Sequence, residues 1–235
     1  MARRAMNPHG CAPVSRGPRA RGVKRGAPSV IITGTLRGGN DREKGESMAR
    51  RKVERIPEKP RRGLVLVLTG NGKGKTTSCL GMAVRAVGYG MRVVMIQFIK
   101  GSLHYGELDG AKRLAPEFEL SPMGKGFVGI RGDTLPFAEH VAAAKKALAT
   151  ARKKMLSGRV DVVILDEVNV ALHLKLLELS DVISFIREKP PAVHLILSGR
   201  NAHEEVIRLA HLVTEMRNIK HPYELGIEAE KGIDY

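Results

Sequence analysis

The sequence contains no tryptophan and only nine other aromatic residues, four tyrosines and five phenylalanines among 235 positions. It has two cysteines, Cys11 and Cys79. Two cysteines cannot form a disulfide framework, and their scarcity is typical of proteins of the reducing cytosol. No stretch approaches the roughly 18 apolar residues that a membrane-spanning helix requires. These absences exclude a disulfide scaffold and predict a soluble, cytoplasmic protein with no membrane partner.

Positive charge is concentrated near the N-terminus. Residues 1–62 contain 17 Lys and Arg against 5 Asp and Glu, a net charge of +12, which leaves +4 of the total +16 for residues 63–235. Such a tail could bind nucleic acid or anionic lipid. It has no aromatic side chain to stack on a base, however, and residues 1–47 offer little that could form a core. We therefore interpret residues 1–62 as a solvated, disordered basic tail and expect no nucleic-acid partner.

The tail contains a second possible start of translation. The letters MARRK at Met48 repeat the pattern MARRA at Met1. An organellar transit peptide is disfavoured because four prolines in the first 28 residues would interrupt an amphipathic helix. We hypothesise that translation begins at Met48 and that the preceding residues are dispensable. A single domain is expected over residues 63–235.

From residue 63 onward, short apolar runs alternate with longer helical patterns. The runs that predict strands are residues 64–69, 92–99, 160–166, 192–198 and, more weakly, 212–216. A helix is predicted over residues 75–88, and a second one is indicated by the apolar stripe Val141, Ala144, Leu148, Ala151 and Met155. This alternation is typical of an α/β fold with a mostly parallel sheet that is flanked by helices on both faces.

A glycine-rich loop, TGNGKGKTT, joins the first predicted strand to the first helix. Its glycines allow backbone N–H groups to surround an anion, a lysine adds a cation, and the helix directs its positive end to the same place. The phosphate-binding pattern G-x-x-x-x-G-K-[ST] is met except that Thr69 replaces the first glycine. We therefore predict a P-loop (RecA-like) fold rather than a glycine-rich turn with surface lysines. The predicted phosphate-binding residues are Gly70, Asn71, Gly72, Lys73, Gly74, Lys75, Thr76 and Thr77.

A pair of carboxylates follows another buried run, VVILDE, which ends in Asp166 and Glu167. The carboxyl ends of parallel strands meet at one edge of the sheet, so this pair is expected near the glycine-rich loop. Together with the Thr76 hydroxyl, the carboxylates could hold Mg²⁺ or Mn²⁺ directly or through water. The pair could also be a helix N-cap. The segment HEEVIRLAH places its histidines eight residues apart, which does not suit zinc.

Several segments together resemble one family. TGNGKGKTTSCLGMAVRAVGYG, VVMIQFIKG, MGKGF, VVILDEVN, ILSGR, LVTEM and KHPYELGIEAEKGIDY are similar, in this order, to ATP:corrinoid adenosyltransferases of the BtuR/CobO/CobP type. The resemblance covers residues 63–235. It implies transfer of the 5′-deoxyadenosyl group of ATP to the Co(I) of a corrinoid, with release of intact triphosphate. The corrinoid would be cob(I)yrinic acid a,c-diamide, cobinamide or cobalamin, in the biosynthesis or salvage of adenosylcobalamin.

The resemblance also implies partners and a set of roles. Mg²⁺, a homodimer and an electron donor such as a reduced flavin or flavodoxin are expected. Lys73 and Lys75 would stabilise the departing triphosphate, and Arg200 is a candidate phosphate contact or a surface arginine. A generic P-loop site would hold the metal with Thr76 and Asp166, whereas the family pattern favours Thr76 and Glu167, with Asp166 as support.

Phe127 matches the family's residue at the corrinoid face, with loop packing as the alternative. Relatives often carry a tryptophan two residues later, where aromatic side chains help to remove the lower axial ligand of cobalt, but this chain has Gly129 there. The competing prediction for the whole chain is an ATP-hydrolysing P-loop NTPase or kinase. A nucleic-acid-binding ATP module driven by the basic tail is the non-enzymatic alternative.

Overall fold

The computed structural model describes residues 62–101, 104–129 and 132–235. Apart from Arg62, the predicted basic tail lies outside these residues, as do Cys11 and the hypothetical start at Met48. The disorder of the tail, the alternative start and the domain boundary therefore stay predictions. Among the described residues, no helix has the length and apolar character needed to cross a membrane.

The centre of the fold is a sheet of six parallel strands in the order β3-β2-β4-β5-β1-β6. Every residue of β2 and β4 is buried, as expected for strands covered on both faces. The predicted parallel α/β architecture is confirmed. The strands are β1 (Val65–Thr69), β2 (Val93–Gln97), β3 (Phe118–Pro122), β4 (Val162–Asp166), β5 (His194–Ser198) and β6 (Leu212–Glu215).

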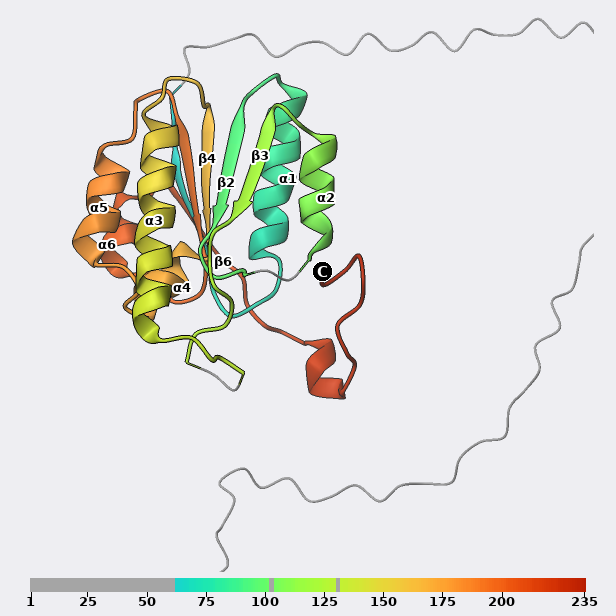
Figure 1. The fold of residues 1–235 in the computed structure, drawn as a ribbon. Coiled ribbons are helices and arrows are strands. Elements are labelled where there is room, and N and C mark those ends of the chain that lie inside the picture. Colours follow the sequence, from blue (N-terminus) through green and yellow to red (C-terminus); the bar gives the residue numbers. More distant parts are fainter. Residues whose placement is uncertain (1–61, 102–103, 130–131) are drawn as a thin grey trace, which may run out of the picture. The chain divides into compact units, whose positions relative to one another are not determined.

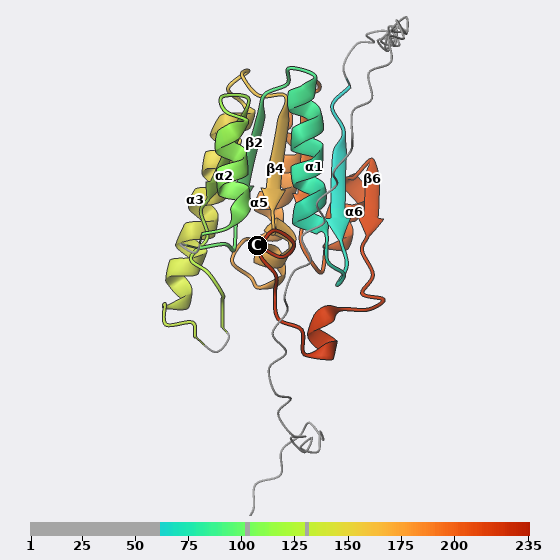
Figure 2. The same ribbon diagram turned by 90° about the vertical axis from the view of Figure 1, so that its right-hand side faces the viewer.

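Helices cover both faces of this sheet (Figure 1). One face carries α1 (Lys75–Gly88) and α2 (Gly106–Arg113), which Figure 2 shows in front of the strands. The opposite face carries α3 (Phe137–Met155), α4 (Val168–His173), α5 (Leu179–Arg187) and α6 (Glu204–Leu209). A 3₁₀ helix, η1 (Pro222–Leu225), follows β6. Helices on both faces were predicted, and α1 has the predicted bounds.

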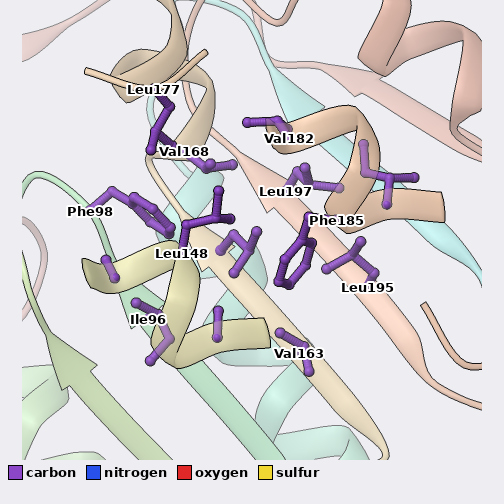
Figure 3. Packing of buried hydrophobic residues seen from close by; sticks show 14 of the residues in the cluster. Ile96, Phe98, Leu148, Val163, Val168, Leu177, Val182, Phe185, Leu195 and Leu197 are labelled. Carbon is purple, nitrogen blue, oxygen red and sulfur yellow. The ribbon is translucent and has the colours of Figure 1, made fainter. Parts of the chain in front are cut away.

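The core consists of two apolar clusters, one on each face of the sheet. On the face of α3, α4 and α5, Leu148 and Phe185 pack near Val163 and Leu195 (Figure 3). The other cluster lies under α1 and α2 and includes Ile164 of β4. Side chains of a strand alternate between faces, so neighbouring residues of β4 enter different clusters. Burial of each Leu or Phe side chain stabilises the fold by about 1.5 to 3 kcal/mol.

The sequence prediction placed neither β3 nor α2, and it gave no bounds for α4, α5, α6 or η1. Only Phe118 of β3 and only Ala111 of α2 are buried. Both elements lie at the edge of the sheet, where a single apolar residue is enough for docking, so neither leaves an apolar run or stripe in the sequence. The other strands occur where they were expected, although four of the five begin one or two residues later than predicted and two end earlier.

Candidate active site

The glycine-rich loop connects β1 to α1, and a second segment of backbone packs against it. A Cβ atom at Gly70 would lie 2.4 Å from the carbonyl oxygen of Met216, and one at Gly72 would lie 2.6 Å from that of Arg217. The N–H of Gly72 donates a 2.6 Å hydrogen bond to the Met216 carbonyl. These glycines are therefore required by the chain that leaves β6, in addition to any role in phosphate binding.

Lys75 is the first residue of α1, and its side chain is buried beneath the loop. Its ammonium group donates hydrogen bonds to the carbonyl oxygens of Gly70 at 2.8 Å and Gly72 at 2.7 Å. Burial lowers the pKa of Lys75, and the carboxylate of Glu167 opposes that shift. The lysine thus places a largely desolvated cation at the centre of the loop.

Asp166, the last residue of β4, is completely buried and accepts hydrogen bonds from three elements. Its donors are the hydroxyl of Thr76 at 3.0 Å, the hydroxyl of Ser198 at 2.6 Å and the side-chain amide of Gln97 at 3.1 Å. Gln97 and Ser198 end β2 and β5, the two neighbours of β4. The structure therefore brings the predicted residues Thr76 and Asp166 together, and it adds two residues that sequence reasoning missed.

Glu167 follows in a left-handed backbone conformation, with φ of 61°. Its backbone N–H donates to the Ser198 hydroxyl at 3.0 Å. Burial, and then the charge of Asp166, raise the pKa of the Glu167 carboxyl. Glu167 is the N-cap residue of α4 but its side chain makes no capping hydrogen bond, which disfavours the N-cap interpretation of this carboxylate. Gly199 has φ of 127°, and an added Cβ would lie 3.0 Å from the backbone nitrogen of Val170 and 3.2 Å from this carboxylate, so a glycine is favoured beside it.

A pocket of about 580 Å³ adjoins these groups. Glu167 and Arg200 form part of its wall, and Phe127 and Tyr105 form another part. The side chain of Phe127 is 62% exposed, so it is available to a ligand rather than buried by loop packing. Tyr105 is a second aromatic side chain in the same pocket, and sequence reasoning did not identify it. The one sequence signal that could have identified Tyr105 is its position four residues after the QFIKG segment.

Two polar clusters hold the walls of this pocket. Lys100 forms an ion pair with Glu107 of α2 and lies 4.3 Å from the centroid of the Tyr105 ring. On the other wall, Asp133 accepts hydrogen bonds from the backbone N–H groups of Gly129 and Leu135, at 2.7 and 3.1 Å.

A buried imidazole supports the second wall. His140 of α3 lies 3.1 Å from the Asp133 carboxylate, and only 2% of its side chain is exposed. The bonds from the backbone N–H groups, followed by the contact with His140, lower the pKa of Asp133. The Asp133 carboxylate thus connects Gly129 and Leu135 to His140 of α3 in this wall of the pocket.

The donor atoms beside the loop are all oxygens. Among the described residues, no group of three or more His, Cys, Asp and Glu could hold a metal ion by itself. The available donors are the Thr76 hydroxyl and the Glu167 carboxylate, with Asp166 behind them. Because Asp166 already accepts bonds from three donors, Glu167 has the freer carboxylate of the pair. A hard cation that keeps bound water or phosphate ligands, such as Mg²⁺, fits this sparse oxygen set.

The histidines of HEEVIRLAH have structural roles. The Nδ1 atom of His203 accepts a 3.2 Å bond from the N–H of Glu205 and caps α6. The Nδ1 atom of His211 accepts a 3.0 Å bond from the N–H of Val65. The two rings thus bind different parts of the backbone, and the expectation that this segment is not a zinc motif fits the geometry.

Comparisons with known proteins find sequence relatives over most of this chain. A sequence model of the ATP:corrinoid adenosyltransferase BtuR/CobO/CobP matches residues 61–235. A corrinoid adenosyltransferase of Pseudomonas aeruginosa is 38% identical over 199 residues, which cover 83% of this chain and 97% of the relative. One from Sinorhizobium sp is 37% identical over 202 residues, with 83% and 93% covered. The solved structure of flagellar accessory protein FlaH from Methanocaldococcus jannaschii is similar with a TM-score of 0.44 at 12% identity, covering 66% of this chain and 71% of that one.

Proposed function

The chain belongs to the ATP:corrinoid adenosyltransferase family BtuR/CobO/CobP, and from this premise we propose how its residues carry out the reaction. The enzyme transfers the 5′-deoxyadenosyl group of ATP to a corrinoid. A bond forms between the Co(I) of the substrate and C5′ of the ribose, while the bond between C5′ and oxygen breaks. Triphosphate leaves intact with the electron pair of that bond.

The observation that carries the proposal is the shared wall between two sites. The glycine-rich loop suits a polyphosphate, and the pocket beside it suits a second, larger ligand. Glu167 and Arg200 lie at the junction of the two. In the orientation that the family implies, the triphosphate occupies the loop and the ribose faces the pocket, so the reacting carbon lies between the substrates.

The loop would stabilise charge that develops on the leaving group. Co(I) is itself a strong nucleophile, so the reaction requires no general base, and the protein contributes alignment and electrostatic stabilisation. The buried cation of Lys75, the more exposed cation of Lys73 and the N–H groups of the loop and of the α1 N-terminus would act on the triphosphate. Asn71 and Thr77 would add polar contacts, and Arg200 would contact the phosphates from the side of the pocket.

We propose Mg²⁺, or Mn²⁺, as the metal cofactor at the oxygen donors beside the loop. Thr76 and Glu167 would contact the ion, and Asp166 would orient Thr76 through its 3.0 Å hydrogen bond. When bound, the ion neutralises part of the triphosphate charge. The raised pKa of Glu167 follows from burial and from the neighbouring Asp166, and a cation would relieve both effects.

The corrinoid would bind in the pocket against aromatic side chains. Phe127 would contact the corrinoid face, as the family pattern implies, although no tryptophan accompanies it. Tyr105 lines the same pocket and would supply the second aromatic contact. Lys100, which lies over the Tyr105 ring and pairs with Glu107, would fix the orientation of that ring. The substrate would be cob(I)yrinic acid a,c-diamide, cobinamide or cobalamin.

The resemblance to the family supports three further proposals. The electron donor would be a reduced flavin or a flavodoxin, the protein would act as a homodimer, and it would work in the cytoplasm.

The proposed transfer can be tested on the full chain with a chemically reduced corrinoid, ATP carrying ¹³C at C5′, and Mg²⁺. We expect the corrinoid product to gain the labelled deoxyadenosyl group, as detected by mass spectrometry. Omission of ATP is the control. A corrinoid of unchanged mass, together with steady consumption of ATP, would favour the alternative of an ATP-hydrolysing P-loop NTPase or kinase.

A further inference from the structure

The last six residues of the chain, 230–235, form a closed turn, here called the C-terminal turn. The N–H of Asp234 donates to the carbonyl of Glu230 at 2.8 Å, and the N–H of Gly232 donates to the main-chain oxygen of Tyr235 at 2.7 Å. One oxygen of the Asp234 carboxylate accepts the N–H of Glu230 at 2.8 Å. The turn therefore holds the Asp234 carboxylate in a fixed orientation with its other oxygen pointing outward.

That second oxygen pairs with Lys73 of the glycine-rich loop. Figures 1 and 2 show the C-terminus below α1 and α2, at the carboxyl end of the sheet. The turn also lies near the start of α2, because a Cβ atom added to Gly106 would lie 3.8 Å from the main-chain carbon and oxygen of Tyr235. Gly106 is the first residue of α2. The ion pair thus places a carboxylate of the turn against a cation of the loop.

Lys73 is one of the cations assigned above to the triphosphate. In the structure its partner is instead a carboxylate of the same chain. The two side chains are 42% and 23% exposed, and ion pairs of this kind contribute little to stability because water screens them. A multiply charged triphosphate with Mg²⁺ can therefore displace the carboxylate, while the turn keeps the carboxylate close enough to return.

We propose that Asp234 competes with the triphosphate for Lys73. The C-terminal turn thereby lowers the affinity of the loop for the triphosphate product and favours its release. This inference rests on the proposed function, in which triphosphate leaves the enzyme intact. Asp234 acts through Lys73 and touches no reacting atom, so it is a positioning residue. The bond from Glu230 and the charge of Lys73 both lower the pKa of Asp234, which keeps the competing group ionised at neutral pH.

Calorimetric titration of the full chain with triphosphate and Mg²⁺ tests the inference. We expect the Asp234→Asn variant to bind triphosphate about 2- to 5-fold more tightly than the wild type, the range that the loss of an exposed ion pair allows. The matched control is Glu228→Gln, which removes the same charge two residues before the C-terminal turn. Glu228 forms no ion pair with any residue that the structure describes. The control should leave the Kd unchanged.

A second comparison isolates the contact itself. In a Lys73→Met background, Asp234→Asn should change the Kd for triphosphate by less than about 1.5-fold, because the competition no longer exists. Equal or weaker binding by Asp234→Asn in the wild-type background, or equal tightening by Glu228→Gln, would overturn the inference while leaving the proposed function intact. A wild-type protein that binds no triphosphate would overturn both. Circular dichroism of each variant confirms that it is folded.

Discussion

The ammonium group of Lys75 donates a 2.7 Å hydrogen bond to the carbonyl oxygen of Gly72, three residues earlier in the loop. A second bond, of 2.8 Å, reaches the carbonyl of Gly70. The lysine therefore fixes the shape of the loop around its own charge before any anion arrives. A preformed cation of this kind needs little reorganisation when negative charge develops on a leaving group.

Replacement of Lys75 tests this role. Lys75→Ala should lower kcat at least about 100-fold, corresponding to roughly 3 kcal/mol of lost stabilisation of the leaving triphosphate. Lys73→Ala is the comparison, because Lys73 is exposed to solvent, and it should lower kcat less than Lys75→Ala does. Steady-state kinetics at saturating ATP and corrinoid measure both. A Lys75→Ala enzyme within about threefold of the wild-type kcat would remove the lysine from the catalytic machinery.

The two glycines at positions 72 and 81 should respond in opposite ways to the same substitution. Gly72→Ala would place a Cβ 2.6 Å from the backbone of Arg217, which cannot move aside cheaply, so ATP binding and stability should both fall. Gly81 lies on the exposed side of α1 with no atom within 4 Å of an added Cβ. Gly81→Ala should raise the free energy of unfolding by about 0.5 to 1 kcal/mol. Chemical denaturation measures both, and a Gly72→Ala variant as stable as the wild type would contradict the packing described here.

Substitution of two exposed phenylalanines, one inside the pocket and one outside it, distinguishes an effect on ligand binding from a general effect of losing a surface aromatic side chain. Phe127 lines the pocket and is 62% exposed, whereas Phe137, 53% exposed, is absent from the pocket lining. Phe127→Ala should raise the KM for the corrinoid about 10-fold or more without a comparable change in the KM for ATP, because it removes a large apolar contact. Phe137→Ala should leave both KM values unchanged. Equal effects of the two substitutions on the corrinoid would argue against a corrinoid site at Phe127.

Glu107 should make stability depend on pH. Burial by itself raises the pKa of Glu107, but the hydrogen bond and charge of Lys100 outweigh it, and the net shift is below the ordinary value of 4.5. A carboxylate with a lowered pKa adds stability that is present above about pH 5 and is lost as pH falls through its folded-state pKa. The difference in the free energy of unfolding between wild type and Glu107→Gln should therefore shrink from pH 6 toward about pH 3.5. Urea titrations at several pH values measure it, and a constant difference would show that the ion pair is not the cause.

The fold was predictable where local sequence carries enough apolar residues. The runs LVLVLT and VVILD have few polar positions because β1 and β4 are covered on both faces, and the loop before α1 marks the start of that helix. Helix α2 and strand β3 were not predictable, since each docks at the edge of the sheet through one buried residue. Their polar letters resemble those of a loop.

The site shows the same division between local and long-range information. The loop and the Asp166–Glu167 pair are contiguous motifs, so their residues could be read from the sequence. Gln97 reaches Asp166 because the register of β2 and β4 places the two residues side by side. The pairing of Lys73 with Asp234 spans 161 residues. Such contacts depend on strand order and on the path of the C-terminus, which no short pattern in this sequence specifies.

The central claim is that the loop holds triphosphate as a leaving group and leaves its phosphorus–oxygen bonds intact. The most direct measurement is ³¹P NMR of the phosphorus products after the full chain has turned over ATP with a chemically reduced corrinoid and Mg²⁺. The account predicts one intact triphosphate for each corrinoid adenosylated. ADP and inorganic phosphate in place of triphosphate, formed in step with turnover, would contradict it.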